Sequence, residues 1–168
     1  MVLSKSELIS ALQHEVRILL HLAGKVDRAQ LEYRPTEKQR STLELLKYLT
    51  VMGPMLTTTA INGGFDVEAY KAANEEAAAR DFDQTVAAIA AQEDFFARTL
   101  GALADADFRA EFAAFDGSKT TKGAFIVTMV LGGYAAYRTQ LFCYLKACGR
   151  DELNTGNLWR GVDPTPVP

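Results

Sequence analysis

The sequence predicts an all-α protein with the architecture of a four-helix bundle, and three observations support this class. Four amphipathic segments of about 18 to 25 residues follow one another, no stretch alternates as a strand does, and no repeat recurs. The length of 168 residues fits a single domain spanning residues 1–168, in which we expect residues 154–168 to form an extended tail.

Composition excludes several classes of protein. The net charge of −3 argues against a nucleic-acid binder, which needs a basic face for phosphates. No apolar run reaches the roughly 18 residues of a membrane span, and the N-terminus does not resemble a signal peptide. Cys143 and Cys148 lie on one predicted helix and point about 140° apart, too divergent for a disulfide. We therefore expect a cytoplasmic protein with no nucleic-acid or membrane partner.

The first helix is expected at residues 5–25, with Ser4 or Ser6 as its N-cap and Gly24 near its end. The members of its apolar stripe are Ile9, Leu12, Val16, Leu19, Ala23 and Val26. His14 and His21 lie on another face, about 10 Å apart along the axis, which is too far to share one metal ion. We place both histidines on the surface.

The second helix begins at Ser41, because Ser41 and Glu44 form a capping box. Pro54 predicts a kink within it, and the Gly63-Gly64 pair predicts its end. Its apolar face comprises Leu45, Tyr48, Leu49, Met52, Met55 and Leu56.

The third helix is expected at residues 83–103, after a connector in which residues 67–79 could form a short surface helix. Glu93 lies near the inner stripe of this helix, so its carboxylate must pair, stay protonated or reach the edge of the bundle. The following connection, residues 104–122, contains a turn signal at Asp116-Gly117 and three phenylalanines that we expect to cover one end of the bundle: Phe108, Phe112 and Phe115.

The fourth helix, residues 125–149, is the most informative stretch. At 100° per residue its inner band spans about 80° and holds Ile126, Val130, Gly133, Tyr137, Leu141 and Tyr144. Arg138 is then directed outward. The inward tyrosines, with Tyr48 of the second helix, allow two interpretations: core side chains with paired hydroxyls, or a polar pocket between the second and fourth helices.

Two short segments resemble the DinB-like (YfiT-like) superfamily of four-helix-bundle proteins. The stretch RSTLELLKYL at residues 40–49, after the Pro-containing RPTEKQ at 34–39, is similar to that family's start of the second helix. The stretch GYAAYRTQ at residues 133–140 is similar to the family's His-x-x-x-His-Arg-Gly-Gln pattern in the fourth helix.

This resemblance implies a metal site formed by three histidines, which often hold nickel or zinc and in some members activate a low-molecular-weight thiol. The corresponding positions here are Tyr48, Gly133 and Tyr137. None is a histidine: glycine has no side chain, and a tyrosine must lose a proton with a pKa near 10 to bind as an anion. We therefore expect no metal and no cofactor.

Two functions follow from this reading. The first is a small-ligand-binding or association module that has lost the metal site, with a homodimer to which Ile18 and Leu22 add contacts. The alternative is a thiol-transferase-like enzyme that polarises its substrate with tyrosine hydroxyls. Both use the same candidate pocket, which comprises Tyr48, Met52, Gly133, Tyr134, Tyr137, Tyr144 and Glu93.

Overall fold

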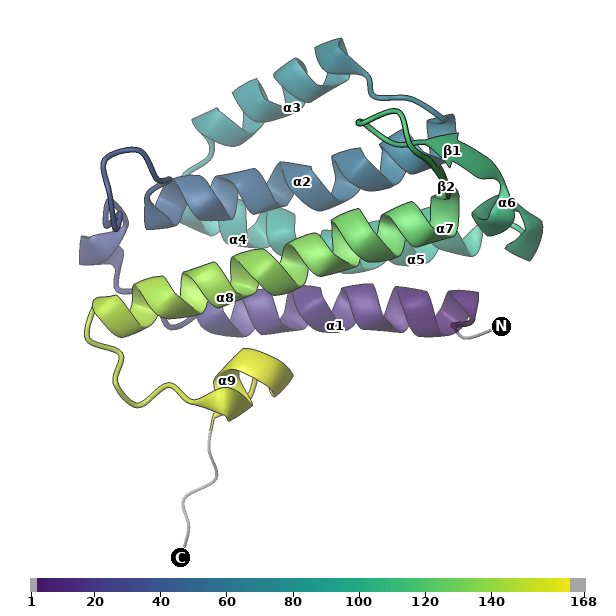
Figure 1. Cartoon of the computed structure of the whole chain (residues 1–168). Coiled ribbons are helices and arrows are strands. Elements are labelled where there is room, and N and C mark those ends of the chain that lie inside the picture. Colours follow the sequence, from purple (N-terminus) through teal and green to yellow (C-terminus); the bar gives the residue numbers. More distant parts are fainter. Residues whose placement is uncertain (1–2, 164–168) are drawn as a thin grey trace, which may run out of the picture.

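The computed structural model describes residues 3–163 and confirms the all-α four-helix bundle. Its main helices are α1 (Lys5–Ala23), α2 (Thr42–Asn62), the pair α4 (Phe82–Ala90) and α5 (Gln92–Gly101), and a last helix that runs from α7 (Lys122–Phe125) through a π-helical segment (Ile126–Leu131) into α8 (Gly132–Ala147). Both α4–α5 and α8 pack on α1 and on α2, so α1 and α2 lie diagonally opposite (Figure 1). Figure 1 also shows that α1 and α8 run in one direction, and α2 and α4–α5 in the other.

Local signals explain the helix ends. Ser4 caps α1 in a capping box with Glu7, and Ser41 caps α2 in the predicted box with Glu44. Pro54 lies inside α2. The third helix is divided in two at Ala91. Among residues 3–163, no helix combines the length and apolarity needed to cross a membrane, and both cysteines are free thiols.

The connections carry the shorter elements. These are a 3-10 turn (Arg28–Gln30), α3 (Val67–Ala79) on the outside of α2, α6 (Asp105–Arg109), and the antiparallel strands β1 (Glu111–Ala113) and β2 (Lys119–Thr121). The sequence predicted no strand, which is wrong for this hairpin, because three-residue strands are too short to show alternation. Its turn does lie at Asp116-Gly117, where Gly117 has a φ of 78°.

The hairpin covers one end of the bundle. The Phe112 and Phe115 rings lie 4.8 and 5.6 Å from the Phe125 ring, centroid to centroid. Phe112 is buried, whereas Phe115 is 57% exposed and also contacts the Phe65 ring. The expected phenylalanine cover is therefore present at this end, although Phe115 faces solvent.

The C-terminal segment differs from its expected extended form. Thr155–Arg160 form helix α9, which begins at the N-cap Asn154 and packs on α1 (Figure 1); residues 164–168 lie outside the described part. Gly161 lies directly against Ile18. Because α9 covers a second side of α1, Ile18 and Leu22 are completely buried within the single chain. The expectation that they contribute to a dimer contact is therefore wrong.

The same helix alters the surroundings of the two histidines. His14 stays exposed, with its Nε2 atom 3.1 Å from the Trp159 carbonyl oxygen. The His21 ring is half-buried and lies 3.0 Å from the Asn157 amide nitrogen, so its placement on the open surface was wrong. A six-residue helix leaves too short an apolar pattern to be recognised from the sequence.

The π-helical segment changes which face of the last helix points into the core, so the predicted face was partly wrong. A π-turn holds one residue more than an α-turn, so the turns that directly follow it are rotated relative to the 100° period. Tyr134 and Arg138 are accordingly buried where Gly133 and Tyr137 were expected, whereas Leu141 and Tyr144 further along are buried as predicted. The outward placement of Arg138 was wrong for this reason.

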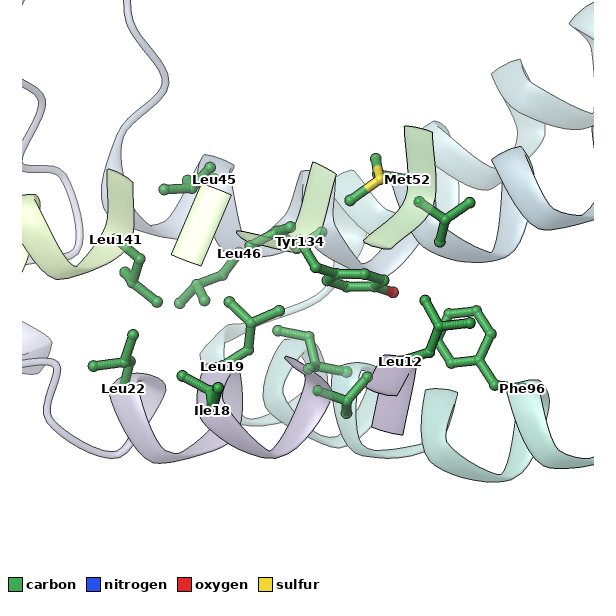
Figure 2. Close-up of a cluster of buried hydrophobic side chains, with 14 of the residues drawn as sticks. Leu12, Ile18, Leu19, Leu22, Leu45, Leu46, Met52, Phe96, Tyr134 and Leu141 are labelled. Carbon is green, nitrogen blue, oxygen red and sulfur yellow. The ribbon is translucent and has the colours of Figure 1, made fainter. Parts of the chain in front are cut away.

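Tyr134 lies at the centre of the core (Figure 2). Its ring is fully buried among leucines of α1 and α2 and meets the Phe96 ring edge to face, 6.0 Å between centroids. Its hydroxyl donates a hydrogen bond to the Gln92 side chain, whose amide in turn donates to the Leu49 carbonyl at 2.9 Å. Gly53 makes room for this ring: a Cβ at Gly53 would lie 2.6 Å from Tyr134 Cζ.

This contact predicts that Gly53→Ala destabilises the protein. Overpacking of this kind costs about 1–3 kcal/mol, of which the better helix propensity of alanine offsets up to about 1 kcal/mol. Gly101→Ala is the matched control, because nothing lies within 4 Å of a Cβ there. In urea unfolding, Gly53→Ala should lower the midpoint and Gly101→Ala should leave it unchanged or raise it; equal midpoints would contradict the close contact.

Candidate functional site

A groove of about 300 Å³ lies between α2 and the last helix, where the sequence predicted a pocket. Four of the expected residues line it: Tyr48, Met52, Gly133 and Tyr137. The remaining lining residues are Leu56, Thr128, Met129 and Gly132. The absence of a side chain at Gly133 leaves the wall open, since a Cβ there would lie 3.2 Å from the Met52 sulfur.

Two tyrosines close one end of the groove. The rings of Tyr48 and Tyr137 meet edge to face, with centroids 5.1 Å apart. Burial raises the pKa of the Tyr48 phenol, and the neighbouring Tyr137 phenol raises it further. The Tyr48 phenol is thus neutral at physiological pH, so it can donate a hydrogen bond but cannot act as a base.

Three of the expected pocket residues lie elsewhere. Tyr134 is completely buried in the core and does not line the groove. The Tyr144 hydroxyl is 3.0 Å from the Arg40 carbonyl oxygen, to which it donates, and it accepts from Gln140. Glu93 pairs with Arg17 across α5 and α1, with Nη1 and Oε2 2.8 Å apart.

Four lining residues were not predicted as members of the site. Leu56 was assigned to the apolar face of the second helix, and Thr128 to the side opposite the core. Thr128 and Met129 belong to the π-helical segment, and Gly132 follows it directly. The wider turn places them beside α2, and no periodicity at 100° per residue could have shown this.

The residues of the groove do not suit a divalent metal. The three positions that the resemblance assigns to ligands do line one groove, but they offer two phenols and a glycine. Zinc and similar ions bind nitrogen, thiolate or carboxylate donors, and a phenol with a raised pKa keeps its proton. Within residues 3–163, no three His, Cys, Asp or Glu side chains come together as a metal-binding group.

The motif residue Arg138 has a different role on the other side of α8. Its Nε atom lies 2.6 Å from the Glu15 carboxylate in a buried ion pair. Its guanidinium also donates to the Leu158 carbonyl and lies 5.0 Å from the Trp159 ring centroid. Arg138 therefore links α8 to α1 and α9, and its function in this structure is to hold the C-terminal helix in place.

The arrangement of helices matches a known fold class. Four-helix-bundle proteins of the DinB-like type share it, as the resemblance in the sequence predicted. A DinB-like protein from Bacillus subtilis, YjoA, has a solved structure that aligns with a TM-score of 0.67 over 88% of this chain and 94% of that chain, at 19% sequence identity. This likeness confirms the DinB-like fold. No protein-family model and no curated protein matches the sequence.

The buried pair of Glu15 and Arg138 predicts a pH-dependent stability in a variant. Burial raises the pKa of Glu15, against the opposing effects of Arg138 and His14. When the pKa of a carboxyl is higher in the folded state than in the unfolded chain, the folded protein becomes less stable as the pH rises from the unfolded-state pKa through the folded-state pKa. Arg138→Met removes the main opposing charge, so at pH 7 it should cost about 3–5 kcal/mol.

This loss should shrink as the pH falls through the pKa of Glu15, because a protonated Glu15 no longer buries an unpaired charge. Urea unfolding of the wild type and the variant between about pH 4 and pH 7 measures the difference. The double variant Glu15→Gln/Arg138→Met should show a smaller loss that does not change with pH. A loss of the same size at every pH in Arg138→Met would contradict a buried charge at Glu15.

Proposed function

We propose that this protein binds a small, mainly apolar molecule in the groove between α2 and α8, and that it does so without a metal. The observation that carries the proposal is the groove itself. Its volume of about 300 Å³ is at the lower end of the range for small-molecule sites, and its walls are apolar apart from two phenols and Thr128. It lies where the resemblance places the metal of the DinB-like family.

The groove has the usual features of a binding site for a small molecule. Met52, Leu56 and Met129 provide adaptable apolar contacts. The Tyr48 and Tyr137 hydroxyls at one end provide a few polar groups that would orient a ligand. These features support binding, and they need no residue that changes its charge.

The alternative, a thiol-transferase-like enzyme, has less support. None of the eight lining residues is a histidine, cysteine or carboxylate, so no side chain is available as a general base. Cys143 and Cys148 do not line the groove. A neutral Tyr48 could polarise a substrate only by donating a hydrogen bond, which is a weaker contribution than proton transfer.

Association is the second part of the proposal, and the homodimer stays a prediction. Between Gly123 and Leu145 the sequence contains one charged residue, Arg138, which is buried. The exposed side of this helix is therefore uncharged, and its exposed members are Ala124, Val127, Thr128, Met129, Gly132, Ala136, Thr139 and Cys143. Such an exposed, uncharged face is better suited to a contact between two copies of the chain than Ile18 and Leu22, which are buried. The cytoplasmic location likewise stays a prediction.

Filling the groove should abolish binding. We expect 1-octanol, a neutral apolar probe, to bind the wild type, as detected by ligand-observed NMR. Gly133→Leu should remove this binding because its side chain occupies the groove. Ala136→Leu is the matched control, since it adds the same side chain to an exposed position of α8 outside the groove.

A second variant guards against misfolding of Gly133→Leu. Met129→Glu places a carboxylate in the apolar groove at a position that is already 38% exposed, so the fold should tolerate it. It should weaken 1-octanol binding as well. Unchanged binding in both groove variants, or equal loss in Ala136→Leu, would show that the groove is not the site.

A further inference from the structure

The end of the groove at Tyr48 adjoins a positively charged recess. The Arg40 guanidinium lies over the Tyr48 ring, 4.0 Å from its centroid. Tyr48 is the common wall between the groove and a recess of about 180 Å³. This recess is lined by Arg40, Glu44, Lys47, Tyr48, Asn74, Ala77 and Ala78.

The charged side chains of this recess differ in their hydrogen-bond and ion-pair partners. The Glu44 carboxylate accepts from the Ser41 backbone N–H at 2.7 Å and lies 3.4 Å from the Arg34 guanidinium. Lys47 donates to the Ala78 carbonyl at 2.8 Å. The Arg40 guanidinium forms no ion pair with any carboxylate of residues 3–163. Lys47 likewise has no ion pair with a carboxylate of residues 3–163, but its ammonium is hydrogen-bonded to the Ala78 carbonyl. Arg40 is therefore the cation that lies on the Tyr48 ring, at the end of the recess next to the groove, where a negative charge can bind.

The opposite end of the groove is apolar and continues beyond it. A hollow of about 350 Å³ beneath the hairpin shares Thr128 and Met129 with the groove. Its aromatic walls are Phe115 and Phe125, and Asp116 at the turn is its one ionisable lining residue. The hollow adjoins the groove at Thr128 and Met129, and the groove adjoins the recess at Tyr48. The row of three cavities therefore has the Phe115 and Phe125 rings at one end and Arg40 at the other.

We propose that the ligand is an amphipathic carboxylate with an unbranched apolar chain. The chain lies along Met52 and Met129, and the carboxylate binds Arg40 beside Tyr48. A guanidinium presents parallel N–H donors that match the two oxygens of a carboxylate, and stacking on an aromatic ring fixes its orientation. This inference rests on the proposed function, because it specifies the chemistry of the ligand of the same groove.

Three probes of equal chain length separate charge from apolar contact. Isothermal titration calorimetry with octanoate, 1-octanol and octylammonium should find octanoate the tightest and octylammonium the weakest. Arg40→Gln should weaken octanoate binding about tenfold, as expected for the loss of a charge-assisted hydrogen bond, and leave 1-octanol unchanged. Arg98→Gln is the matched control, since it removes the same charge from an exposed position on α5.

The outcomes distinguish this inference from the proposed function. Equal affinities for octanoate and 1-octanol would refute a carboxylate ligand, and so would equal effects of Arg40→Gln and Arg98→Gln on octanoate binding. Neither result would contradict the binding of apolar molecules in the groove. Octanoate binding that is unchanged in both Gly133→Leu and Met129→Glu would show that the groove is not the binding site, which would refute the proposed function as well. Preferential binding of octylammonium would also contradict a site built around Arg40.

Discussion

The rest of the structure depends on the π-helical segment Ile126–Leu131, because it sets which side of α8 faces the core. The wider turn rotates the following helix relative to a regular α-helix. Tyr134 and Arg138 consequently enter the interior, where Gly53 leaves room for the phenol ring and Glu15 neutralises the guanidinium. The same rotation leaves Gly133 and Tyr137 half-buried at the edge, facing α2.

The two sides of α8 therefore have different roles. The inner side is a closely packed contact in which Tyr134 bonds to Gln92 and Arg138 pairs with Glu15, and through Arg138 it also holds α9 on α1. The side toward α2 keeps a groove because Gly133 has no side chain and the π-helical segment contributes small or flexible ones. A groove without metal-binding donors can still bind an apolar molecule, since such binding needs space and apolar walls rather than ionised ligands.

Much of the fold could be predicted from the sequence, because local signals determine it. The Ser41–Glu44 capping box and the Asp116-Gly117 turn were found where the residues indicated. The π-helical segment could not be predicted, because a period of 100° per residue already assumes a regular α-helix. Helix α9 was missed because its six residues show no periodicity, and its burial of Ile18 and Leu22 depends on tertiary packing. In the groove, Tyr48, Gly133 and Tyr137 followed from the resemblance, whereas Thr128, Met129 and Gly132 depend on the unpredicted turn.

The most direct test of the account is methyl NMR of the methionines during a titration with octanoate. Met52 and Met129 line opposite walls of the groove, on α2 and on the π-helical segment, whereas Met55 lies on α2 outside it. If the groove is the binding site, the Met52 and Met129 methyl signals shift together with one affinity, and the Met55 signal shifts little. Saturable binding of octanoate that leaves Met52 and Met129 unmoved would contradict the account.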